Sequence, residues 1–134
     1  MERQLPRHDV GIGRTVAGAF DAVVARTEAV LKEQGFGVLT RIDVKATMKE
    51  KLDVDVPSNV ILGACNPSIA HRALTIEPRI GLLLPCNVVV RQEGNAVSVE
   101  AIEPFAMVEM FPDRDLNAVA AEASDRLRKA IEAI

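Results

Sequence analysis

Apolar side chains recur with helical spacing in two long segments of the chain. Over Ala19–Gln34 they fall on one side of a helix, and Gly35 is placed to end that helix. The same spacing returns over Leu116–Ile131, and we expect Pro112 and Asp113 to open this last helix. The two segments therefore predict amphipathic helices that pack on a common core.

Two shorter helices are indicated by residues that cap helix N-termini. Asp43 can cap a helix over residues 44–52, whose apolar stripe lies opposite three lysines that we expect to be solvated. Asn66 followed by Pro67 is a strong helix start, because the Asn side chain accepts from a free amide and Pro needs no N–H there. This helix should end at Glu77-Pro78.

Alternating apolar and polar residues, or short apolar runs at 60–62 and 81–91, predict five strands, over residues 10–18, 36–42, 60–62, 81–91 and 96–102. The first contains three glycines, and we expect it at an edge of the sheet. Pro85 interrupts the fourth, which therefore requires an edge position or a bulge. Residues 92–95 supply a hairpin turn between the last two strands.

Residues 105–111 are apolar without a clear period. Met107 and Met110 in this segment could form an exposed adaptable patch, although such residues more commonly face a core or a subunit contact.

The order of these elements is strand, helix, strand, helix, strand, helix, strand, strand, helix. It predicts a two-layer α+β fold with helices on one face of a mainly antiparallel sheet, since the hairpin excludes a purely parallel one. The length fits one domain over residues 1–134, with residues 1–9 as a loosely ordered segment.

Composition narrows the classes of partner. Of 134 residues, 49 % are apolar and 3 % aromatic, with no Trp and no Tyr, so an aliphatic core can form without the stacking platforms of single-strand nucleic-acid binders. The net charge of -3 likewise argues against a nucleic-acid partner. No apolar run is long enough to span a bilayer and the first residues do not resemble a secretory signal, so we expect a cytoplasmic protein without a membrane partner.

The most distinctive local feature is a Cys-Asn pair that occurs twice, each time beside a proline at the end of an apolar run. The candidate ligand-binding residues are Cys65, Asn66, Pro85, Cys86 and Asn87. Cys65 precedes a predicted helix N-terminus, where free amides lower a thiol pKa. If the two strands are neighbours, the thiols of Cys65 and Cys86 could approach each other and act as a catalytic pair.

A purely structural interpretation of the same residues stays open. Both cysteines can be small buried hydrophobes, with Asn66 only a cap and Asn87 bonded to backbone at Pro85. The 21-residue spacing and the scarcity of histidines, only His8 and His71, argue against a metal site. We expect His71 to be exposed, and no phosphate-loop or other cofactor signature is present.

Four ordered segments of this sequence resemble the bacterial and archaeal domain-of-unknown-function 302 family: Gly35–Thr40, Asp43–Leu52, Leu62–Pro67 and Ile80–Val90. The resemblance extends from about residue 10 onward, and both Cys-Asn pairs match the family pattern; only the glycine-rich segment 10–18 departs from it. It implies a small α+β fold of the TATA-binding-protein type and a homodimer, and it implies no activity.

Three functions remain at this point. The first is a homodimeric binding or sensing module with its site at the two Cys-Asn turns, for a small ligand that the sequence does not identify. The second is a thiol-dependent redox enzyme in which Cys65 attacks and Cys86 resolves. The third is a structural or assembly module, in which the cysteines affect only stability.

Overall fold

The computed structural model describes residues 9–134, so His8 and all but the last residue of the segment expected to be loosely ordered lie outside the described part. One five-stranded sheet organises these residues, with strand order β1-β5-β4-β3-β2 and every neighbouring pair antiparallel. The strands are β1 (Gly11–Val16), β2 (Gly37–Asp43), β3 (Asn59–Cys65), β4 (Cys86–Glu93) and β5 (Ala96–Ile102). The predicted α+β class and the antiparallel sheet are confirmed.

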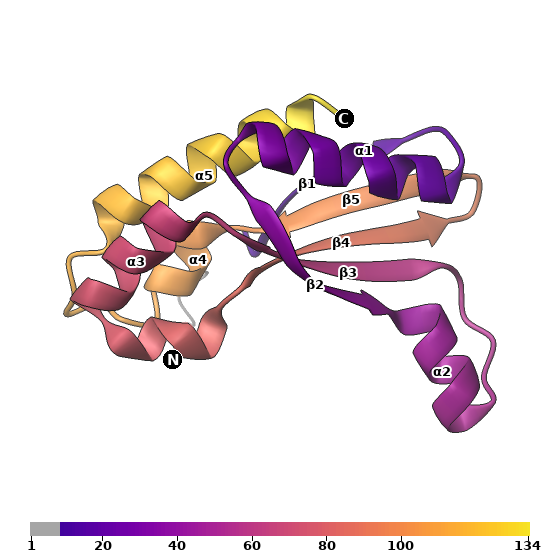
Figure 1. Cartoon of the computed structure of the whole chain (residues 1–134), viewed down its shortest axis with the longest axis horizontal. Helices are drawn as coiled ribbons and strands as arrows, with labels where there is room; N and C mark the ends of the chain where they lie inside the picture. The colour runs from indigo at the N-terminus through magenta and orange to yellow at the C-terminus, as the bar shows by residue number, and fades with distance from the viewer. Residues whose placement is uncertain (1–8) are drawn as a thin grey trace, which may run out of the picture.

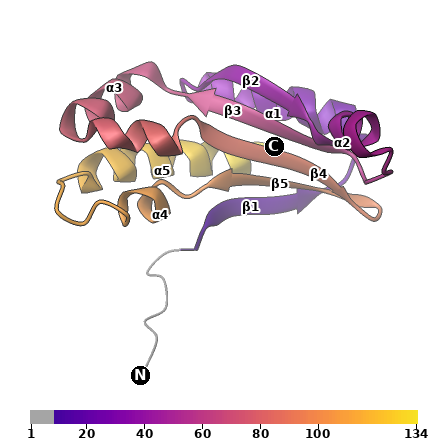
Figure 2. The ribbon, with the colours of Figure 1, turned by 90° about the horizontal axis from the view of Figure 1, so that it is seen from below.

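Two long helices, α1 (Phe20–Glu33) and α5 (Asn117–Glu132), cover one face of the sheet (Figure 1). Their apolar sides and the inward residues of the strands make the main core, whose members include Val24, Leu31, Leu62, Val88, Val90, Val97, Val99 and Leu127. Figure 2 looks at the sheet from the other side, with the strands in front of both helices. We call that side the outer face.

The capping residues act as their types predict. Gly35 has a positive φ of 83° directly after α1, and Asp43 accepts a hydrogen bond from the Ala46 amide (2.9 Å) at the start of α2 (Val44–Leu52). Unlike α1 and α5, α2 projects from one end of the sheet, and none of its residues is buried (Figure 1).

The glycines of β1 make room for a charged side chain on the outer face. A Cβ on Gly11 would collide with the Glu100 carboxylate, and one on Gly13 would lie 3.3 Å from the Glu100 Cβ. Glu100 in turn lies 3.4 Å from the Arg91 guanidinium. The glycine-rich segment forms the edge strand that was predicted, and its lack of side chains leaves the space that Glu100 from β5 fills.

At the end of the sheet opposite α2, three short helices form a second, smaller cluster with the N-terminal half of α5. They are α3 (Pro67–Ile76), the 3₁₀ helix η1 (Pro78–Leu83) and α4 (Pro104–Val108). Its buried residues are Ile69, Ala73, Ile80, Leu116, Val119 and Ala123. Residues 105–111, which had no clear period, thus begin as the helix α4.

Two predicted boundaries are wrong in this region. Residues 81–83 belong to η1 and the strand begins only at Cys86, because Glu77 caps a new 3₁₀ turn. The edge position or bulge expected for this strand is also wrong: Pro85, which has no N–H, stands before the strand, and β4 lies at the centre of the sheet with regular ladders on both sides. The last helix begins at Asn117 rather than near Pro112, because Leu116 is buried in the second cluster and holds residues 112–116 in a turn.

Candidate functional site

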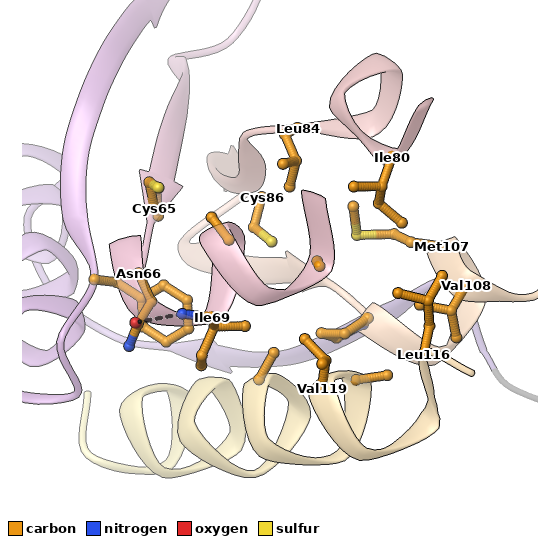
Figure 3. Close-up of a pocket in the computed structure, with 17 residues that line it drawn as sticks. Cys65, Asn66, Ile69, Ile80, Leu84, Cys86, Met107, Val108, Leu116 and Val119 are labelled. Carbon is orange, nitrogen blue, oxygen red and sulfur yellow. Dashed lines mark hydrogen bonds between the residues drawn. The ribbon is translucent and has the colours of Figure 1, made fainter. Parts of the chain in front are cut away.

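A cavity of about 50 Å³ lies inside the second cluster, between its helices and the adjoining ends of β3 and β4 (Figure 3). We call it the apolar cavity. None of its 17 lining residues carries a charged side chain. Most of the wall is aliphatic, including Ile69, Ala73, Ile80, Leu84, Val108, Leu116 and Val119.

The structure brings three of the five candidate ligand-binding residues to this cavity. Cys65, Asn66 and Cys86 line it, while Pro85 and Asn87 do not. Asn87 is exposed, and Pro85 lies against Gly63, where its Cγ would be 2.8 Å from an added Cβ. The repeated Cys-Asn sequence therefore does not form two equivalent turns around one site.

Asn66 performs the capping role predicted from its position before Pro67. Its Oδ1 accepts a hydrogen bond from the Ile69 amide at 3.2 Å, visible in Figure 3, and Pro67 is the first residue of α3. This bond fixes the direction in which α3 leaves β3. It places Ile69 and Ala73 in the cavity wall.

The two cysteines lie on neighbouring strands, as was required for them to approach each other. Cys86 pairs with Ala64 across the ladder, so its side chain shares the face of the sheet that Ala64 presents to the core. Cys65 follows Ala64 and alternates to the opposite face. Both thiols are free, and their sulfur atoms point in different directions in Figure 3.

Cys86 is held in its neutral form. Burial, and to a smaller extent the nearby Cys65 thiol, raises the pKa of Cys86 to about 11 from its ordinary value of 9.0. At neutral pH the sulfur in the cavity wall is therefore a protonated, weakly polar group. The redox hypothesis gives Cys86 the role of the resolving thiol, which must also attack as a thiolate, and burial disfavours that form of Cys86.

Glu77 connects two walls of the apolar cavity. Its carboxylate accepts hydrogen bonds from the Arg79 amide (2.8 Å) in η1 and from the Arg114 guanidinium (3.3 Å) in the loop before α5. The bond from the Arg79 amide, with a smaller contribution from Arg114, lowers the pKa of Glu77. The ionised carboxylate thus ties η1 to the loop at neutral pH.

Glu103 makes the corresponding connection between α4 and α5. It is 2 % exposed and accepts hydrogen bonds from the Ser124 hydroxyl (3.1 Å) and the Arg128 guanidinium (2.8 Å), both on α5. It also caps α4 through the Phe105 amide (3.4 Å). These three hydrogen bonds replace the water that the carboxylate loses, so Glu103 can be buried beside the cavity.

Sequence reasoning missed most of the cavity wall, because its residues are spread along the chain from Phe36 to Ala123 and meet only in the folded structure. The signal closest to it was the Met107 and Met110 segment. Met107 is buried and lines the cavity, whereas Met110 is exposed. Met107 is therefore a core residue, as is more common for methionine in such a segment, whereas Met110 is not.

Residues 9–134 contain no group of three or more His, Cys, Asp and Glu side chains that could hold a metal ion. His71 is exposed on α3, as expected. Within the same residues, no helix combines the length and the apolarity needed to cross a membrane.

Comparison with known proteins places this fold in one family. The family model described as "Domain of unknown function DUF302" matches residues 12–134. The crystal structure of an uncharacterized conserved DUF302 protein from Bacillus stearothermophilus is similar, with a TM-score of 0.85 and 31 % sequence identity over 92 % of this chain and 97 % of that one. No curated protein matches the sequence. Because the family model covers all but the first few residues, the chain belongs to the DUF302 family.

Proposed function

We propose that this protein is a binding module that holds a small, uncharged, apolar ligand in the apolar cavity. The observation that carries the proposal is the wall itself, which is mostly aliphatic, has no charged side chain and keeps the Cys86 thiol neutral. A charged ligand would lose its hydration there without gaining a partner. An apolar ligand loses no such interaction and gains contact with the wall.

The size of the cavity limits what can enter. An engineered cavity of about 150 Å³ admits benzene, while this one measures about 50 Å³. A ligand of more than a few atoms therefore requires the wall to move. Two parts of the wall are short helices, η1 and α4, and Met107 can change shape at little cost.

The alternative of a thiol-dependent enzyme receives less support. Thiol exchange requires an attacking thiolate and a second sulfur within reach. Here the pKa of Cys86 is raised, and the sulfur atoms of Cys65 and Cys86 point in different directions. A structural module remains the alternative to be tested, and it predicts that the cavity takes up no ligand.

Benzene and xenon are suitable probes, followed through the methyl NMR signals of the protein. We expect saturable shifts of the Ile69, Ile80 and Val119 methyl signals, which lie in the wall. In Ala123→Val, added methyl groups enter the cavity and should abolish the shifts. Ala121→Val is the matched control, because Ala121 is exposed on the same helix and should leave them unchanged.

Wild-type signals that do not respond at saturating xenon would overturn the proposal. Equal responses in wild type and Ala123→Val would overturn it as well, because the probe would then bind elsewhere. Thermal unfolding of both variants checks that each is folded.

A further inference from the structure

Strand β1 borders the sheet with one side unpaired, and Figure 2 shows it as the outermost strand. The Glu103 amide donates to the Val10 carbonyl (2.9 Å), so these two residues form a hydrogen-bonded pair of the ladder between β1 and β5. Such pairs alternate along a regular antiparallel ladder, so Gly11, Gly13 and Thr15 direct their N–H and C=O groups away from β5. Within residues 9–134 no hydrogen bond reaches these groups. We call this row of main-chain groups the free edge.

The opposite edge of the sheet, β2, is less suited to pairing with another strand. Its ladder with β3 shifts register between Val38 and Thr40, which leaves Leu39 as the extra residue of a bulge. A bulge interrupts the regular row of main-chain groups that an incoming strand needs. Because β1 contains neither a bulge nor a proline, an extended backbone can pair along its whole free edge.

We propose that the free edge of β1 binds an extended peptide segment of another protein, which adds a strand to the sheet and carries a lysine or arginine on the outer face. In β-strand addition, main-chain hydrogen bonds provide affinity, and the side chains at alternate positions provide selectivity. This binding surface is separate from the apolar cavity, because no residue of β1 lines that cavity.

The carboxylate of Glu100 selects a basic side chain. It lies over Gly11, where an added Cβ would collide with it, and so it reaches the free edge. Its Oε1 is 3.4 Å from the Arg91 guanidinium, while nothing within residues 9–134 bonds to its Oε2. Strand alternation places only Glu93, Glu100 and Arg91 as charged residues on the outer face of β1, β5 and β4, which leaves one excess negative charge. A cationic side chain beside Gly11 or Gly13 complements this charge.

On the other face of the sheet, the added strand borders a groove of about 280 Å³ between β1 and α5. The groove is lined by Ile12, Gly13, Arg14, Arg128, Ile131 and Glu132. Arg128 is paired with the buried Glu103 carboxylate (2.8 Å), and the charges of Arg14 and Glu132 offset each other. With no net charge in the groove, Ile12 and Ile131 favour an apolar peptide side chain there.

A second copy of this chain does not supply the required side chain. Its own free edge presents Gly11, Gly13 and Thr15 on the outer face, none of which is cationic. Edge-to-edge pairing of two copies would also add a second Glu100 carboxylate to the same face. The segment that fits the free edge therefore belongs to a different protein.

A blocked peptide of sequence Thr-Val-Lys-Val-Lys-Val-Thr is a suitable probe, because its lysines share one face of a strand and its valines the other. Titrated to about 3 mM, which detects dissociation constants near 1 mM, it should cause saturable NMR shifts of the Gly11, Gly13 and Thr15 amides. An analogue with glutamine in place of both lysines should bind about two- to fivefold more weakly, as for an exposed ion pair. In Glu100→Gln the two peptides should bind equally.

Proline at position 15 tests the free edge itself. Thr15→Pro removes an outward N–H without removing a bond to β5, and it should weaken peptide binding about tenfold. Thr15→Val is the matched control, because it keeps the N–H and a β-branched side chain, and it should bind like wild type. Circular dichroism checks folding, and if Thr15→Pro does not fold, the comparison of both peptides on wild type and Glu100→Gln decides alone.

The proposal is overturned if the three free-edge amides do not respond at the highest peptide concentration. Equal binding by Thr15→Pro and Thr15→Val overturns it, because the peptide would then bind elsewhere, and so does a lysine preference that survives in Glu100→Gln. Shifts of the same amides that depend on protein concentration without peptide would mean pairing between copies and would also overturn it. The result does not depend on whether the apolar cavity binds benzene or xenon.

Discussion

Cys86 should react with alkylating reagents far more slowly than an ordinary thiol, because only the thiolate is nucleophilic. Burial raises the pKa of Cys86 to about 11, from an ordinary value of 9.0. At pH 8 the thiolate fraction of an ordinary thiol is then about one in ten, and that of Cys86 about one in a thousand. The expected rate with iodoacetamide is therefore about 100-fold lower.

The assay can follow both cysteines in the wild-type protein. Trypsin cleaves after Arg72 and Arg79, so Cys65 and Cys86 fall on separate peptides that mass spectrometry can quantify after timed alkylation. For Cys86 the logarithm of the rate should rise by one per pH unit from pH 7 to 10 without levelling. A rate that levels near pH 9 would refute the reasoning, because it would mean that access alone slows the reaction.

The same raised pKa has a consequence for stability. The folded state prefers neutral Cys86, so this contribution is fully present below pH 9 and is lost as the pH rises from 9 to 11, an effect on the order of 3 kcal/mol. In Cys86→Ala, the free energy of unfolding should not show this decrease at alkaline pH. Parallel alkaline decline in wild type and Cys86→Ala would contradict the assigned pKa.

Three further predictions concern the frame around the site. Gly63→Ala should lower the free energy of unfolding in urea by roughly 1–3 kcal/mol, because the added Cβ would collide with Thr40 and Pro85. The control Gly37→Ala has open space around the added Cβ and should change this free energy by less than about 1 kcal/mol. Equal effects of the two substitutions would refute the packing argument. Since the folded pKa of Glu77 is lowered, Glu77→Gln should be less stable than wild type above pH 4.5, and the difference should shrink as the pH falls through the lowered pKa; a difference independent of pH would contradict this. Arg128→Ala removes a partner of the buried Glu103 carboxylate and should lower the free energy of unfolding by about 1–3 kcal/mol. Lys129→Ala breaks only an exposed ion pair with Asp125 and should lower it by less than about 1 kcal/mol. A larger loss in Lys129→Ala than in Arg128→Ala, measured by thermal or urea unfolding, would exclude the role assigned to Arg128.

Features that depend on neighbours in the chain could be predicted well. Asp43, Asn66 and Gly35 cap or end helices where they were expected to, because capping is a bond or a dihedral angle within a few residues. The hairpin after β4 follows from the same kind of local signal, and Gly94 there has a positive φ of 59°. Together with hydrophobic periodicity, these signals were enough for the α+β class and for the order of all elements except η1 and α4.

Where burial depends on distant residues, the sequence was silent or misleading. The apolar run before Pro85 is equally suited to a strand and to η1, and only Glu77 and its contact with Arg114 decide between them. Leu116 shortens α5 because it is buried against residues from other helices. The same applies to the site: the sequence pointed to Cys65 and Cys86, but not to the other residues that enclose the cavity.

The sequence alone therefore determined the five strands, the four longer helices, the family resemblance and the positions of the two cysteines. The tertiary structure decided which face of the sheet stays uncovered, which residues enclose the apolar cavity and why Cys86 stays protonated. The physical reason is that periodicity and capping act over a few residues, whereas desolvation and cavity shape arise from side chains that meet only after the chain has folded.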